Sequence, residues 1–503
     1  MDTVESLSGP SLESESATTS EPLTGRAVKS FAWSALSFGG SKVVVFVSTV
    51  VLARLLTPLD FGTVAAASAV IVFFDVVLDL GIGAAVIYEQ QRGVTERVQT
   101  AFTLNVIVTI ALTGLGLLAT PAIASFFGLT AHEDVFQALF IYLFIRGMGQ
   151  LQDSLLQRDL RFGRRAGVEI SRSVVRAGVS IGLAVAGLGV WALVGGLLAG
   201  ELTATVLAWI LVRFRPHFTL DRAVIGAIMS FGLSYIALKL VDAIAIDSDY
   251  LVVGHTLGPT QLGYYSIGYR LPELALMSLY WIFGAVAFPL YSQARMRGRD
   301  LPVQGMLRVL RLITLFSFPA GVLLALSSRD IIYVIFSAKW APAITPMVLI
   351  SLMTAIVSVG FSSGDLFPAM GKPGTLLVLN VPLTILLVIG YIVAAPYGIV
   401  WVAAAHVVMA IVSQGARFVL VSRKFGTTVL AQVRATKPGV CAVLGVLALA
   451  GPVRLLLPHG LPTLILLGLL GVSGAVGGVM LGARSTLGEV RELVGLLRPR
   501  AGG

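Results

Sequence analysis

The stretch Leu-Leu-Thr-Pro-Leu-Asp-Phe-Gly at residues 55–62 ends one apolar run of the chain and begins the next. A related stretch, Thr-Leu-Gly-Pro-Thr-Gln-Leu-Gly, occupies residues 256–263. Pro58 and Gly62 of the first stretch each recur 201 positions later in the second. The two stretches therefore indicate an internal repeat of a helix–turn–helix unit.

Apolar runs like those around residues 55–62 fill most of the chain. The 503 residues are 56% hydrophobic and only 12% charged, with a mean hydropathy of +0.90. Soluble domains carry about 25% charged residues, so this composition excludes a soluble enzyme, a DNA-binding protein and a disordered scaffold. Continuous runs of about 20 apolar residues predict an all-α polytopic membrane protein. We predict fourteen transmembrane helices, at residues 28–53, 61–88, 98–120, 134–156, 167–187, 190–212, 224–247, 261–290, 304–326, 344–368, 375–394, 397–420, 438–457 and 461–482.

A second pair of similar stretches supports the repeat. Gly-Leu-Gly-Val-Trp-Ala at 187–192 resembles Tyr-Gly-Ile-Val-Trp-Val at 397–402, and the two tryptophans lie 210 positions apart. Six predicted helices lead from the first helix to its counterpart, and because six is even the two halves have the same orientation. Parallel repeats of this kind are a transporter architecture with the substrate site between the halves, near the bilayer midplane.

The repeat divides the chain into two six-helix lobes with an appended pair of helices. The predicted units are a disordered cytoplasmic tail at 1–25, an N-lobe at 26–217, a C-lobe at 218–425, two C-terminal helices at 426–482 and a cytoplasmic C-terminal tail at 483–503.

The distribution of basic residues predicts the orientation. With the N-terminus inside, 23 of the 36 Lys and Arg residues fall in inside segments, and 4 fall outside, namely Arg54, Arg329, Lys339 and Arg454. Cytoplasmic loops of membrane proteins carry such an excess of positive charge. The net charge of +10 is thereby explained without a nucleic-acid partner. We predict a multi-pass protein of the cytoplasmic (inner) membrane with both termini in the cytoplasm.

The sequence contains little that points to catalysis. The predicted loops are too short for a catalytic domain, and the chain has no GxxxxGK[ST], HExxH or CxxC motif. Cys441 is the only cysteine, and the five histidines are scattered along the chain, which argues against a metal site. We therefore expect a protein that is not an enzyme and holds no cofactor or metal. A coupling ion, H⁺ or Na⁺, is left open.

Charged residues inside the predicted spans are the candidate binding groups. Each costs about 2.5–3.5 kcal/mol or more to insert, and such residues usually face a cavity. Four basic residues could hold an anionic headgroup in a wet cavity between the lobes: Lys42, Arg146, Lys239 and Arg270. Four carboxylates could pair with them or carry a coupling ion: Asp75, Asp79, Asp242 and Glu273.

Each of these residues has a plainer interpretation. Lys239 with Asp242, and Arg270 with Glu273, are three residues apart and could form local ion pairs that serve assembly only. The basic group at Arg172–Arg176 is interpreted as an anchor at the inner membrane surface rather than as a binding site.

Four motifs resemble a known family. They are Val-Leu-Ala-Arg-Leu-Leu-Thr-Pro-Leu-Asp-Phe-Gly at 51–62, Phe-Asp-Val-Val-Leu-Asp-Leu-Gly-Ile-Gly-Ala-Ala-Val-Ile at 74–87, Arg-Asp-Leu-Arg-Phe at 158–162 and Gly-Val-Trp-Ala-Leu-Val at 189–194. Over residues 28–425 the chain resembles Wzx-type polysaccharide flippases, in the polysaccharide-transporter branch of the MOP superfamily. The exporters of exopolysaccharide, colanic acid and teichuronic acid type are the most similar group.

The resemblance implies a function. It implies alternating access by two six-helix lobes and export of an undecaprenyl-diphosphate-linked oligosaccharide to the outer leaflet. It also implies a cationic central cavity, to which the four basic candidates are assigned by location. The expected partners are the lipid-linked oligosaccharide and membrane lipids, together with a polysaccharide polymerase and glycosyltransferases.

Three other functions compete with this interpretation. A MATE-type drug or cation antiporter shares the repeat but usually has twelve spans and an acidic cavity. A lipid-linked peptidoglycan precursor flippase also has fourteen spans. A membrane polymerase or ligase would normally carry a large outer loop, whereas the predicted outside loops of this chain are short.

Overall fold

The fold is known from a computed structural model of the chain. It describes residues 23–79, 94–159, 161–212, 214–277 and 301–484, with single positions between 280 and 295 and between 486 and 489. Residues 1–22 of the predicted tail, the end of the second predicted span and most of the second half of the eighth lie outside the described residues, and residues 23–25 of the predicted tail belong to the first helix.

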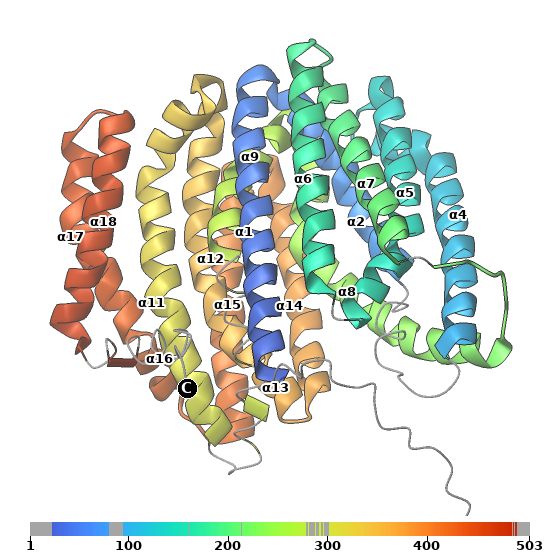
Figure 1. Cartoon of the computed structure of the whole chain (residues 1–503). Coiled ribbons are helices and arrows are strands. Elements are labelled where there is room, and N and C mark those ends of the chain that lie inside the picture. Colours follow the sequence, from blue (N-terminus) through green and yellow to red (C-terminus); the bar gives the residue numbers. More distant parts are fainter. Residues whose placement is uncertain are drawn as a thin grey trace, which may run out of the picture.

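Long helices make up nearly all of the described chain (Figure 1). They are α1 (Leu23–Leu55), α2 (Pro58–Asp79), α4 (Val94–Phe126), α5 (Glu133–Arg158), α6 (Phe162–Val185), α7 (Val190–Val212), α8 (Arg222–Leu257), α9 (Pro259–Pro272), α11 (Leu301–Asp330), α12 (Ile344–Gly364), α14 (Pro373–Ala394), α15 (Ile399–Phe425), α17 (Lys437–Leu456) and α18 (Leu461–Gly482).

Short helices join several of the long ones. They are the 3₁₀ turns Thr130–His132, Ala338–Ala343 and Ala395–Tyr397, the π-helical turns Glu273–Met277 and Ile331–Phe336, and the helices α13 (Leu366–Ala369) and α16 (Val429–Ala435).

The predicted all-α fold class is confirmed, since no strand occurs among the described residues. Nine segments of the described chain are long and apolar enough to cross a membrane, and the count of fourteen crossings stays a prediction. The spans predicted at 190–212 and 461–482 coincide with α7 and α18. In contrast, α8 runs ten residues beyond its predicted end at 247, and it stops only at Gly258, whose φ is 82°.

The long helices run side by side and alternate in direction along the chain (Figure 1). We call the end of the bundle with the α5–α6 turn (Arg158–Arg165) the basic end, and the end with the α1–α2 turn (Leu55–Pro58) the far end. The pair α17 and α18 stands at one edge of the molecule and packs on α11, outside the other helices (Figure 1).

The two repeated stretches of the sequence meet each other in space. Helices α2 and α9 cross near their first residues, at the far end. A Cβ atom on Gly62 would collide with the carbonyl oxygen of Pro259, and one on Gly263 would collide with that of Pro58. The contact is reciprocal, as expected for two equivalent helices related by a local two-fold axis. The two repeated stretches of the sequence therefore also form a contact between the two halves.

A second contact joins the halves at the far end. The indole nitrogen of Trp340, which is fully buried, donates to the carbonyl of Ala53 at 2.8 Å. The ammonium of Lys339 donates to the carbonyls of Arg54 and Leu56, at 2.9 and 2.7 Å, and so caps the C-terminus of α1. The guanidinium of Arg54 in turn donates to the carbonyl of Ile335 at 2.9 Å. Two of the four predicted outside cations thus hold the halves together.

Glycines allow close helix packing elsewhere. Gly196 and Gly200 on α7 bring that helix against the backbone of α6 at Arg172 and Arg176. Gly474 and Gly478 on α18 pack in the same way against α17. Small residues four apart are typical of tightly packed helices in membranes.

Candidate functional site

A polar cavity of about 600 Å³ lies among α2, α5, α6 and α7, and Lys239 of α8 contributes to its wall. Four bases line it: Arg146, Arg165, Arg172 and Lys239. Five carboxylates line it as well: Asp75, Asp79, Asp153, Glu169 and Glu201. The wall therefore carries both signs of charge, which differs from the predominantly cationic cavity that the resemblance implies.

Each arginine of the cavity wall is held by a carboxylate. The Nε atom of Arg146 lies 2.6 Å from Asp75 Oδ1, and both side chains are about one third exposed. Arg165 pairs with Asp153 at 2.8 Å. Arg172 lies between two acids, whose oxygens are 3.0 and 3.4 Å from its nitrogens. The charges of these arginines are therefore already offset by carboxylates of the protein.

The carboxylates of α2 are fixed from α5. Asp75 and Asp79 are four residues apart and share one face of α2. Arg146 binds the first, and the side-chain amide of Gln150 donates to the second at 3.0 Å. Because Arg146 and Gln150 are also four residues apart, two polar contacts one helical turn apart join α2 to α5. This arrangement positions the wall of the cavity.

The pairing of Arg146 with Asp75 predicts the outcome of a double substitution. We expect Arg146→Gln and Asp75→Asn each to lower the amount of folded protein in the membrane, because each leaves the other charge without its partner. Since the pair is partly exposed, the cost should be only about 1 kcal/mol. The double variant should recover both folded protein and export, as measured by fluorescence size-exclusion chromatography and a surface-polymer assay. Recovery of folding without export would instead show that Arg146 binds substrate.

Two further arginines, one in each predicted lobe, are not part of the cavity wall. Arg176 on α6 and Arg270 on α9 are half-buried, and each is within range of the electric field of the other. Neither guanidinium has a hydrogen bond or an ion pair within the described part of the chain. Glu201 also acts on Arg176, but its carboxylate is already shared with Arg172.

The depth of these two arginines follows from the helix geometry. Arg176 is fourteen residues into α6 from the basic end, and Arg270 is eleven residues into α9 from the far end. At about 1.5 Å per residue the two side chains start roughly 21 and 16 Å from those ends. Both arginines therefore lie well inside the bundle, away from the ends at which their helices begin.

The remaining predicted site residues are spread over several places. Lys42 is half-buried on α1 and does not line the cavity. Asp242 is exposed on α8, where Lys239 and Arg417 act on it. Glu273 is exposed in the π-helical turn that follows Pro272 and forms no ion pair with Arg270 in the structure. The described residues therefore give no support to the local-pair interpretation of Arg270 with Glu273. The structure brings Arg146, Lys239, Asp75 and Asp79 together.

A buried polar cluster in the C-lobe was not predicted. Asp249 is fully buried, and its carboxylate accepts a hydrogen bond from the hydroxyl of Tyr265 at 2.8 Å. The Nδ1 atom of His406 lies 3.9 Å from the same oxygen and 3.3 Å from the hydroxyl of Tyr269. These residues join α8, α9 and α15. They could hold a proton, but they lie apart from the cavity wall.

Sequence reasoning did not include Arg176 among the candidate binding residues, although a signal was present. Glu169, Arg172 and Arg176 recur at spacings of three and four and so share one face of α6. Such a charged face over two turns of a membrane helix indicates a polar lining rather than an anchor at the surface.

Comparison with known proteins identifies relatives over most of the chain. Residues 51–345 match a family described as polysaccharide biosynthesis protein. The chain is 25% identical over 346 residues to the teichuronic acid biosynthesis protein TuaB of Bacillus subtilis (strain 168), a match that covers 68% of this chain and 70% of TuaB. It is 24% identical over 327 residues to the succinoglycan biosynthesis transport protein ExoT of Rhizobium meliloti (strain 1021), covering 65% and 66%.

Solved structures share the fold. The lipid II flippase MurJ in an inward closed conformation superposes with a TM-score of 0.75 at 11% identity, covering 90% of this chain and 99% of MurJ. An inward-facing multidrug resistance transporter of the MATE family, in the MOP superfamily, gives a TM-score of 0.57 at 16% identity, covering 78% and 94%. At these identities the likeness establishes the fold alone.

Proposed function

The chain belongs to the polysaccharide biosynthesis protein family, and we propose that it is a flippase for a lipid-linked oligosaccharide. Its substrate is an oligosaccharide repeat unit on undecaprenyl diphosphate, which it moves by alternating access from the inner to the outer leaflet of the cytoplasmic membrane. Both chain termini are in the cytoplasm, and the protein carries out transport without catalysis. Glycosyltransferases supply the substrate and a polymerase consumes it.

The observation that carries this proposal is the pair Arg176 and Arg270. The charge of Arg270 acts on Arg176, and two cations that interact in a low-dielectric environment repel, so an anion bound near both would be favourable. A diphosphate carries roughly two negative charges and offers several acceptor oxygens to two guanidinium groups. Because one arginine comes from each lobe, a bound diphosphate would bridge the lobes.

The membrane potential supports the direction of transport. A membrane potential of 100 mV, negative inside, favours the outward movement of two negative charges by roughly 4.6 kcal/mol, at about 2.3 kcal/mol per charge. The cavity among α2, α5, α6 and α7 supplies polar groups that replace the water around the sugars during the passage. Lys239 is exposed on the cavity wall and adds a positive charge there.

Deletion of the gene tests the proposal in the native bacterium. We expect cells without the protein to lose one surface polysaccharide and to accumulate its lipid-linked repeat unit on the cytoplasmic side. Re-expression should restore the polymer, whereas a lipid II flippase or a MATE-type transporter supplied in its place should not. Unchanged polysaccharide together with increased drug sensitivity would overturn the proposal in favour of drug efflux.

A further inference from the structure

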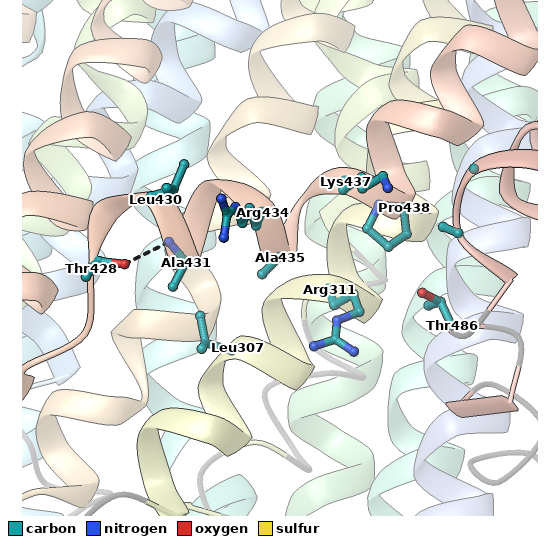
Figure 2. Close-up of a pocket in the computed structure, with 12 residues that line it drawn as sticks. Leu307, Arg311, Thr428, Leu430, Ala431, Arg434, Ala435, Lys437, Pro438 and Thr486 are labelled. Carbon is teal, nitrogen blue, oxygen red and sulfur yellow. Dashed lines mark hydrogen bonds between the residues drawn. The ribbon is translucent and has the colours of Figure 1, made fainter.

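A second pocket, of about 410 Å³, lies at the basic end of the molecule, away from the site described above. Its walls come from the start of α11, from α16, from the first residues of α17 and from the residues that follow α18. Figure 2 shows Arg434 and Lys437 on the α16–α17 junction, with Leu307 and Arg311 of α11 on the opposite side of the pocket.

The charge of this pocket is positive. Arg311, Arg434 and Lys437 contribute three cations, and Glu489 pairs with Arg311 from the chain beyond α18. Arg434 and Lys437 are exposed and have no hydrogen bond or ion pair within the described residues. The pocket therefore carries two cations that are free to bind an anion, beside a third that is shared with a carboxylate.

The pocket lies at the level of a membrane surface. The apolar segment Leu301–Phe336 has 36 residues, about 54 Å of helix, so its ends project beyond a hydrocarbon core of about 30 Å. The apolar span of α17 starts at Lys437, directly beside the pocket. The arginine of α11 and the basic residues of the α16–α17 junction are thus at the boundary between lipid tails and water.

Helix α16 has the character of an interfacial helix. Leu430 and Val433 are 55% and 49% exposed, although they are apolar, and Arg434 follows them directly. Leu444, two turns into α17, is 61% exposed. Apolar side chains exposed next to a cationic pocket, on a helix that continues into a membrane span, are suited to contact with acyl chains.

We infer that this pocket binds the phosphate headgroup of an anionic phospholipid from the surrounding leaflet. The headgroup phosphate lies between Arg434, Lys437 and Arg311, and the acyl chains descend along the exposed apolar side of α16 and α17. A basic pocket between helices at the membrane surface is the known form of such sites. The bound lipid ties the appended pair α17 and α18 to α11, and so links this pair to the C-lobe.

The test measures lipid binding by the full-length protein purified in detergent. Dioleoylphosphatidylglycerol is titrated into the wild type and into the double variant Arg434→Gln/Lys437→Gln, with native mass spectrometry as the readout. At about 1 kcal/mol for each basic residue, the affinity should fall about 30-fold. The matched control is Arg423→Gln/Lys424→Gln, which removes the same charge from exposed residues at the same end of the bundle but outside the pocket. It should bind as the wild type does.

A second variant keeps the inference testable if the first folds poorly. Glu489→Gln frees Arg311 and should tighten the binding of dioleoylphosphatidylglycerol about fivefold. Unchanged affinity in both variants, or an equal loss in the control, overturns the site. If inorganic phosphate displaces dioleoylphosphatidylglycerol as well as unlabelled lipid of the same kind does, the assignment to a lipid is overturned and a soluble anion is favoured. Phosphatidylcholine should not displace dioleoylphosphatidylglycerol.

Discussion

Replacing Arg176 and Arg270 by alanine is expected to abolish the appearance of the polysaccharide on the cell surface. In the proposed site each guanidinium makes charge-assisted hydrogen bonds to the diphosphate, and such a bond contributes about 1.5–3 kcal/mol. A single replacement should therefore slow export by a factor of about 10 to 100, and the double variant should fall below detection. The measurement is surface polymer per folded protein in a strain that carries the variant gene on its chromosome.

A matched control separates loss of the site from loss of the protein. Arg454 is a half-buried arginine of α17 that lines neither pocket, so the Arg454→Ala variant should export normally. Arg176→Lys and Arg270→Lys keep the charge but lose the bidentate hydrogen bonding of a guanidinium, so they should retain more activity than the alanine variants do. Full export by the Arg176→Ala/Arg270→Ala variant would show that transport does not depend on these two arginines.

Alanine at Gly62 or Gly263 is expected to open the far end of the molecule. The added Cβ atom meets a backbone carbonyl of the other half, which cannot move aside as a flexible side chain can. Such overpacking costs typically 1–3 kcal/mol, and we expect about 2 kcal/mol at each position. Because the two contacts are reciprocal, both substitutions should weaken the same closure between α2 and α9.

Cysteine labelling measures this opening directly. The native Cys441 is replaced by serine, and a reporter cysteine is placed at Ala53, which is fully buried beneath Trp340. A maleimide should label the reporter slowly in the parent and at least tenfold faster with Gly62→Ala or Gly263→Ala. Gly114→Ala is the control, because a Cβ there meets no atom within 4 Å. Equal labelling in all four proteins would mean that the glycine contact does not keep the far end closed.

Much of the fold could be predicted because its signals are local. The apolar run that forms α7 is bounded by Gly189 and by the polar residues after Val212, so its ends could be read from the sequence. The recurrence of Pro58 and Gly62 indicated the repeat correctly, since a turn needs particular residues at fixed spacing. The extension of α8 was missed because Asp247 and Asp249 look like the end of a span, although both lie inside the helix.

The site could be predicted only in part, because it depends on which helices face each other. Helical spacing placed Asp75 and Asp79 on one face of α2, but it could not show that Arg146 neutralises the first. The electrostatic effect of Arg270 on Arg176 acts between helices far apart in the sequence, and no local sequence pattern predicts it. The cluster around Asp249 and His406 was missed for the same reason.

Translocation by the purified protein tests the central claim most directly. The protein is reconstituted into liposomes with a fluorescent polyprenyl-diphosphate disaccharide, and an impermeant quencher reports the fraction of probe in the outer leaflet. We predict movement toward the positive side of an imposed potential, at a rate that rises with the voltage and is lost in the Arg176→Ala/Arg270→Ala protein. A wild-type rate equal to that of protein-free liposomes, or equal rates in wild type and variant, would contradict the account.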